Sequence, residues 1–167
     1  MKNLWAPWRI NFILGDKDVD CFLCKEPENG PGPESLVLAV CRHSFVIMNR
    51  YPYSNGHLLV SPLRHVSLPS ELEPIEQDEL HRLLVQSVDI LSELFATDGC
   101  NVGMNLGRAA GAGIDDHIHY HIVPRWFGDT NAMSVVGGSR VIPEALDASW
   151  EKLRPHFAAL EEEFKVQ

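Results

Sequence analysis

The sequence is short of positive charge and has no long apolar run. Its 167 residues include 14 Lys and Arg against 23 Asp and Glu, a net charge of −9 with His neutral. Because neutralisation of phosphates dominates the affinity for duplex DNA, an acidic chain without a basic stripe is not expected to bind nucleic acid. No stretch approaches the roughly 18 apolar residues of a membrane span, so no membrane is expected as a partner.

Cysteine is also scarce. The chain has four, of which Cys21 and Cys24 form a CxxC pair, and this does not make a disulfide framework. Residues 1–9 lack the apolar segment of a signal peptide. The expected location is therefore the cytoplasm, where a CxxC pair indicates a metal half-site, a redox pair or coincidence.

Length and composition predict one globular domain. Hydrophobic residues make up 45% and charged residues 22%, close to globular averages. A chain of this length buries enough surface for a core without cross-links. We expect a single domain over residues 1–167, with a core at about 20–130, an N-terminal segment 1–19 and a C-terminal helical extension 131–167.

Apolar periodicity predicts an α+β fold with an antiparallel sheet. Short apolar runs indicate strands at 36–40, 44–49, 57–62, 101–105 and 117–123. Leucines and valines at three- and four-residue spacing predict one long helix that starts near Pro74, reaches Phe95 and is closed by Gly99. A C-terminal helix is expected over 146–164, with a kink at Pro155. Hairpins followed by one helix and further strands indicate an α+β domain.

Histidine is unusually concentrated in one segment. His117, His119 and His121 alternate with apolar and aromatic residues, so in a strand the three imidazoles share one face. A solvated polar face explains three such imidazoles poorly. Either they bind a catalytic metal, as histidines do in zinc hydrolases, or one neutral imidazole attacks phosphorus while its neighbours orient it. The alternation alone does not choose between the two.

Residues 117–123, HIHYHIV, resemble the HφHφHφφ motif of the histidine-triad superfamily of nucleotidyl hydrolases and transferases. Residues 49–60 resemble the nucleoside-binding strand and turn of that family, and 4–9 and 124–131 resemble its diadenosine tetraphosphate phosphorylase branch. The resemblance covers roughly 4–133. It implies a half-barrel antiparallel sheet with one long helix, to which the periodicity adds the C-terminal helix, and usually a homodimer that joins two sheets.

The resemblance implies catalytic roles for three histidines. His119 matches the nucleophile that takes the α-phosphate, His121 matches a histidine that helps hold the phosphate oxygens, and His57 matches a histidine behind the triad. The implied reaction cleaves a nucleoside phosphoanhydride, such as diadenosine tetraphosphate, through a covalent nucleotidyl-histidine intermediate. Inorganic phosphate or water is the expected acceptor, and the branch resemblance alone favours adenine as the base.

Substrate-binding residues follow from the same resemblance. Asn49 matches a residue at the ribose and base, and Asn105 matches the Asn or Gln at the phosphate and leaving-group side. The glycine-rich stretch before the triad departs from branches that carry Gln or Ser there. At this place Gly111 and Gly113 leave room and free N–H groups, so we expect a nest for an acceptor phosphate, which favours phosphorolysis. Two nearby aspartates would oppose an anion.

One structural zinc ion is expected, held by Cys21, Cys24, His65 and His117. A CxxC pair supplies two thiolates at the spacing of a tetrahedral half-site, which histidines often complete. Zinc-bearing histidine-triad proteins and galactose-1-phosphate uridylyltransferases resemble this arrangement, with the first triad histidine as a ligand. The metal would fix the N-terminal segment against the active-site strand and leave His119 free for chemistry.

Several alternatives stay open at this point. A nucleoside phosphoramidase or another adenylyl hydrolase of the superfamily, a metal-dependent hydrolase with three histidine ligands, and a non-catalytic nucleotide-binding regulator all fit the pattern, although an intact His119 argues against the regulator. A homodimer is expected from the family resemblance and from Val85 and Ile90, which lie off the main apolar stripe of the long helix. The alternative is that the C-terminal segment covers these two residues.

Overall fold

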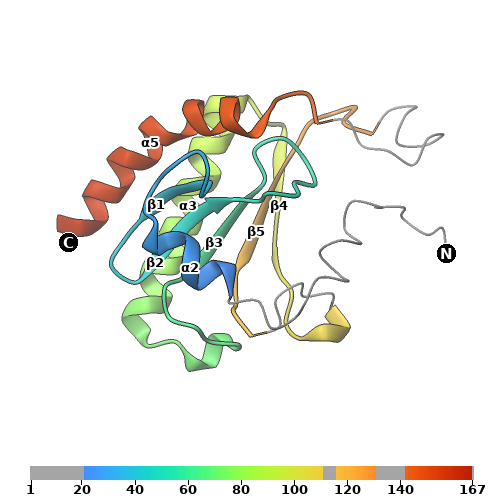
Figure 1. Cartoon of the computed structure of the whole chain (residues 1–167). Helices are drawn as coiled ribbons and strands as arrows, with labels where there is room; N and C mark the ends of the chain where they lie inside the picture. Colours follow the sequence, from blue (N-terminus) through green and yellow to red (C-terminus); the bar gives the residue numbers. More distant parts are fainter. Residues whose placement is uncertain (1–20, 111–115, 131–141, 167) are drawn as a thin grey trace.

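The computed structural model describes residues 21–110, 116–130 and 142–166 of the chain (Figure 1). Its elements are α2 (Phe22–Glu28), β1 (Val37–Val40), β2 (Ser44–Met48), β3 (Leu58–Pro62), η2 (Pro69–Glu71), α3 (Pro74–Phe95), β4 (Gly99–Met104), η3 (Arg108–Ala110), β5 (Tyr120–Arg125) and α5 (Leu146–Val166). No helix in these ranges is long and apolar enough to cross a lipid bilayer.

The five strands form one open antiparallel sheet, as the sequence predicts. The strand order is β1-β2-β3-β5-β4, so β3 and β5 lie side by side and β1 and β4 form the edges. In the β3–β5 pair, Leu59 is opposite His121 and Leu58 is opposite Ile122. This register brings the end of the loop before β3 next to the histidine-rich segment, and so positions the candidate site.

Two helices complete the core. Figure 1 shows α3 packed against one face of the sheet and α5 beside β1. The apolar stripe of α3 places Leu83 and Leu91 in the core at 0% exposure. On α5, the Trp150 indole donates to the Val37 carbonyl at 2.9 Å, and Arg154 donates to the neighbouring carbonyl of β1. The C-terminal helix therefore covers an edge strand and donates to two of its carbonyl groups.

The structure corrects the expected boundary of the histidine strand. Strand β5 begins at Tyr120, three residues later than the sequence predicts. The backbone before it bonds elsewhere: the Ile118 N–H donates to the Val66 carbonyl at 2.8 Å, and the His117 carbonyl accepts from the His119 side chain at 2.9 Å. Because these groups are used outside the sheet, the ladder starts only after the second histidine of the triad.

The helices differ from expectation at two places, the end of α3 and the presence of α2. The long helix ends at Phe95 with Ala96 in the left-handed conformation (φ 46°), whereas the expected terminator, Gly99, is the first residue of β4. Helix α5 continues past Pro155 to Val166, in line with the expected C-terminal helix. Short α2, over the CxxC pair, was not expected, since seven residues carry too little periodicity.

Gly56 is the point where the loop between β2 and β3 crosses α3. Its φ is +71°, and a Cβ there would lie 3.1 Å from the Phe95 ring and 3.3 Å from Leu91. Gly30 has the same backbone conformation, with φ +72°, but a Cβ there would meet nothing within 4 Å. Alanine at Gly30 would thus cause backbone strain alone, whereas alanine at Gly56 would cause backbone strain and steric overlap.

We predict that Gly30→Ala lowers the free energy of unfolding by about 1 kcal/mol, the cost of a left-handed alanine. Gly56→Ala should lower it by a further 1–3 kcal/mol or so, because the methyl group also overpacks the core. Urea denaturation of both variants measures the difference. Equal losses of unfolding free energy in the two variants would show that Gly56 is not closely packed against α3.

Candidate active site and metal centre

The structure brings the three predicted catalytic histidines together. His57 comes directly before β3, His119 directly before β5, and His121 lies in β5. The ring centroids are 5.2 Å apart for His57 and His121, and 4.9 Å apart for His119 and His121. His57 is 1% exposed and His119 7%. The cluster is therefore a group of imidazoles at the centre of the sheet, of which His57 and His119 are buried and His121 is half-buried.

Hydrogen bonding fixes which nitrogen of His119 is free. Its Nδ1 lies 2.9 Å from the His117 carbonyl oxygen. A carbonyl only accepts, so Nδ1 carries the proton, and the neutral ring has its lone pair on Nε2. Burial lowers the pKa of His119, with the bond to the His117 carbonyl opposing this effect. A neutral imidazole with an orientated Nε2 lone pair is suited to nucleophilic attack.

A second chain of hydrogen bonds sets the tautomers of His57 and His121. The Tyr53 N–H donates to His57 Nδ1 at 3.1 Å, and His57 Nε2 lies 3.0 Å from His121 Nδ1. Since Nδ1 of His57 accepts, its Nε2 carries the proton and donates to His121. Neutral His121 then carries its own proton on Nε2, where it is a hydrogen-bond donor beside His119.

Burial keeps His57 uncharged. It lowers the pKa of His57 to about 3, and the neighbouring His121 and His119 lower it further in the same direction. Asn49 contacts the same nitrogen of the His57 ring. Its Nδ2 lies 3.3 Å from His57 Nδ1, and its Oδ1 accepts from the Tyr51 N–H at 2.9 Å. The predicted substrate residue Asn49 thus also supports the histidine cluster.

Sequence reasoning gave no role to Tyr53. Its ring lies 4.7 Å from the His57 ring and 6.0 Å from the His121 ring, centroid to centroid, and its backbone orients His57. The residue lies inside the segment that resembles the nucleoside-binding turn, which was the available signal. The other predicted substrate residues contribute less here: Asn105 follows β4 and is half-buried, while Gly111 and Gly113 lie outside the described residues.

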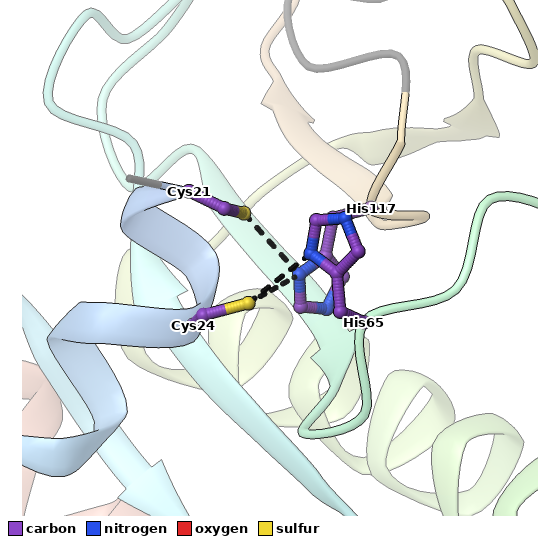
Figure 2. A group of neighbouring side chains, drawn as sticks. All are labelled: Cys21, Cys24, His65 and His117. Carbon is purple, nitrogen blue, oxygen red and sulfur yellow. Dashed lines mark hydrogen bonds between the residues drawn. The ribbon is translucent and has the colours of Figure 1, made fainter. Parts of the chain in front are cut away.

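The four predicted metal ligands form one cluster. Cys21 precedes α2 and Cys24 lies in its first turn, while His65 follows β3 and His117 precedes β5. One donor atom from each residue lies within 4.8 Å of all the others. Figure 2 shows the two thiols and the two imidazoles pointing toward one another from three separate segments.

The donor chemistry of this cluster fits a zinc ion. His117 Nε2 lies 2.8 Å from the Pro62 carbonyl and donates to it, so the lone pair of the neutral ring is on Nδ1. That Nδ1 lies 3.4 Å from the sulfur atoms of both Cys21 and Cys24, and His65 Nδ1 lies 3.2 Å from Cys24. Two thiols and two imidazole lone pairs are a common donor set of tetrahedral structural zinc.

A bound cation would offset the cost of ionising the thiols of this cluster. Burial raises the pKa of Cys24 to about 11, and the neighbouring Cys21 raises it further. A divalent cation would stabilise the thiolates against this penalty. The segment that carries His65 is anchored next to it, since Arg64 pairs with buried Glu76 at 2.6 Å. That hydrogen bond lowers the pKa of Glu76 to about 2, so the anchor persists in mild acid.

The sequence profile of the HIT domain matches residues 33–128, more than half of the chain. The chain belongs to the HIT family. Among curated HIT relatives, the AP-4-A phosphorylase of Mycobacterium tuberculosis is 33% identical over 159 residues, which cover 87% of this chain and 79% of that protein. The bis(5'-nucleosyl)-tetraphosphatase of Schizosaccharomyces pombe is 30% identical over 93 residues, which cover 56% and 50% of the two chains.

Solved structures show the same HIT fold. A zinc-bound histidine triad family protein from Mycobacterium smegmatis has a TM-score of 0.64 at 24% identity, over 85% of this chain and 95% of that one. A hypothetical histidine triad nucleotide-binding protein from Sulfolobus tokodaii has a TM-score of 0.67 at 24% identity, over 84% and 94%. The expected half-barrel architecture of this family is thereby confirmed.

The buried, neutral state of His57 makes stability depend on pH. Below pH 6.5 the unfolded chain protonates this side chain, whereas the folded chain does so only near its lowered pKa of about 3. Stability should therefore fall with acidification by about 1.4 kcal/mol per pH unit for this one group. In His57→Gln, the fall in unfolding free energy between pH 6 and pH 4 should be shallower by roughly that slope. Parallel pH curves for the two proteins would contradict the prediction.

Proposed function

We propose that this chain is a nucleotidyl hydrolase or transferase that cleaves a nucleoside phosphoanhydride, with diadenosine tetraphosphate as the leading substrate. One observation carries the proposal: a buried, neutral His119 whose Nε2 lone pair is fixed by the bond from Nδ1 to the His117 carbonyl. The AP-4-A phosphorylase and tetraphosphatase named above support the substrate class. Inorganic phosphate or water is the proposed acceptor.

In the proposed reaction, His119 Nε2 attacks the α-phosphorus and the bond to the leaving polyphosphate breaks. A covalent nucleotidyl-histidine results. The Nε2 proton of His121, set by the bond from His57, donates to a phosphoryl oxygen and stabilises its charge. The acceptor oxygen then bonds to phosphorus as the bond to Nε2 breaks, which restores the neutral imidazole; when water is the acceptor, its proton is released to solvent. Two in-line displacements leave the configuration at phosphorus unchanged.

The residues around the histidines are assigned by the same proposal. Asn49 and Asn105 would bind the nucleoside and phosphate ends of the substrate, with adenine as the base, and Gly111 and Gly113 would cradle the acceptor. A catalytic metal on the three triad histidines is less well supported, since the Nδ1 atom of His117 faces two thiols rather than the other imidazoles.

We further propose one structural zinc ion on Cys21, Cys24, His65 and His117. The donor set supports it, as does the zinc-bound relative from M. smegmatis. When bound, zinc supplies a cross-link between α2, the segment after β3 and the triad. The orientation of His119 does not depend on the metal, because the His117 backbone carbonyl accepts from His119 Nδ1 whatever the His117 ring binds.

A homodimer and a cytoplasmic location complete the proposal. Val85 is 45% exposed, whereas Ile90 is partly buried against the core, so only Val85 of the two residues that suggested a dimer is well exposed. The edge strand β4 offers better support, because it is exposed along most of its length and Val102 is 46% exposed. All four cysteines are free thiols, as expected in a reducing compartment.

His119→Asn should lower turnover of diadenosine tetraphosphate by more than about a thousandfold, because it removes the nucleophile. Nucleotide affinity should change little. Rates on diadenosine tetraphosphate, nucleoside phosphoramidates and sugar nucleotides, each with and without phosphate, identify the substrate and the acceptor. His81→Asn, the same change at an exposed histidine of α3, is the matched control.

The stereochemical course at phosphorus tests the covalent step. A chiral thiophosphate substrate should give a product of retained configuration, whereas inversion would rule out a nucleotidyl-histidine. Activity in His119→Asn that chelation abolishes and zinc restores would also contradict the assignment, because it would place the chemistry on a metal.

Protein purified without chelator should contain about one zinc ion per chain by elemental analysis. Cys21→Ser with Cys24→Ser should lose the metal, and Cys100→Ser, outside the cluster, should keep it. Chelation should lower the thermal unfolding temperature, since the metal cross-links three segments. Far less than one zinc per chain, or full retention in the double variant, would contradict this site.

A further inference from the structure

The C-terminal helix reaches the loop that holds Tyr53. Ser149, in the first turn of α5, donates its hydroxyl to Glu144 at 2.7 Å and lies 3.3 Å from the Asn55 side-chain oxygen. The Asn55 amide group lies 3.5 Å from the same Glu144 carboxylate, which also forms an ion pair with Lys152. Ser149 is 1% exposed, so this network is shielded from water on its inner side.

Two of the three residues of this network lie outside the family match. The HIT profile ends at residue 128, whereas Glu144 and Ser149 lie beyond it. The residues that meet here are 89 and 94 positions apart in the chain. The C-terminal extension therefore makes this contact, which has no role in the candidate site described above.

The contact fixes a short stretch of chain that ends in the histidine cluster. Asn55 is two residues from Tyr53, whose backbone N–H donates to His57 Nδ1. Between them, the buried Ser54 hydroxyl donates to the Pro124 carbonyl of β5 at 2.6 Å. Movement of Asn55 would therefore displace the one backbone donor that holds His57 in the tautomer required by His121.

The Asn55 amide is well matched to this place. Its NH₂ group donates to the Glu144 carboxylate, and its oxygen lies beside the Ser149 hydroxyl, whose single proton goes to the nearer Glu144. The ionised Glu144 strengthens these bonds, because hydrogen bonds to charged groups are the stronger ones. The hydrogen bonds from Lys152 and Ser149 lower the pKa of Glu144 and keep it ionised.

We propose that Asn55, Glu144 and Ser149 are positioning residues through which the C-terminal helix holds Tyr53 and the His57–His121 hydrogen bond in their active arrangement. The effect on turnover rests on the proposed function, but the effect on the histidine rings does not. None of the three side chains needs to touch the substrate.

A reciprocal exchange tests the network. Asn55→Asp sets a carboxylate against Glu144, so turnover of diadenosine tetraphosphate should fall about tenfold or more, mainly in kcat, because small displacements at the reacting groups cost that much. Glu144→Gln in the same chain restores an amide–carboxylate pair and should bring the rate back to within about threefold. Glu151→Gln, an exposed α5 residue with the same charge change, is the matched control.

The imidazole ¹H–¹⁵N spectrum gives a readout that needs no substrate. The signals of His57 and His121 should shift in Asn55→Asp and return in the double variant, while those of exposed His81 stay unchanged. If Asn55→Asp does not fold, Ser149→Ala removes one hydrogen bond without adding charge and should shift the same signals in a smaller degree.

The two hypotheses fail in distinguishable ways. A wild-type chain that turns over none of the substrates overturns the proposed function and leaves the ring signals to decide this inference. Unchanged His57 and His121 signals in both Asn55→Asp and Ser149→Ala would overturn the positioning role. So would a loss in Asn55→Asp that Glu144→Gln fails to restore, because it would mark a local folding defect.

Discussion

The hydrogen bonds of His117 are the constraint on which the rest of the site depends. Its Nε2 proton is held by the Pro62 carbonyl, its Nδ1 lone pair faces the thiols of the CxxC pair, and its own carbonyl accepts the Nδ1 proton of His119. A single residue with 0% exposure thereby joins β3, the cysteine helix and His119, the proposed nucleophile. Substitution of its ring would remove the contacts with Pro62 and the two thiols, whereas the bond to His119 is made by the backbone carbonyl.

The second feature of the site is that the buried imidazoles of His57 and His119 are uncharged. The Tyr53 N–H donates to Nδ1 of His57, so the ring proton of His57 is on Nε2 and donates to His121. One backbone group therefore sets the direction of both hydrogen bonds. Burial depresses the pKa values of His57 and His119, which keeps both rings neutral. A neutral His119, the proposed nucleophile, suits attack on phosphorus, because its ring need not first lose a proton. His121 beside it is the proposed hydrogen-bond donor to the phosphoryl oxygen.

Much of this arrangement could be predicted from the sequence, for local reasons. Alternation predicted neighbouring imidazoles, and the structure brings His119 and His121 together, while His117 turns to the cysteines. The CxxC spacing marked half of the candidate metal cluster. The start of β5 could not be predicted, because it depends on where the Ile118 N–H finds a partner, and that partner is Val66. The contact of Asn55 with α5 is equally invisible, since polar residues 89 or more positions apart leave no periodic signal.

The tautomers of the histidine rings at neutral pH test this account most directly. Long-range ¹H–¹⁵N correlation of the imidazole nitrogens assigns the protonated nitrogen of each ring. The account predicts that His119 is neutral with its proton on Nδ1, while His57 and His117 are neutral with theirs on Nε2. A His119 that is charged, or that carries its proton on Nε2, would contradict it, because Nε2 would then have no lone pair with which to attack phosphorus.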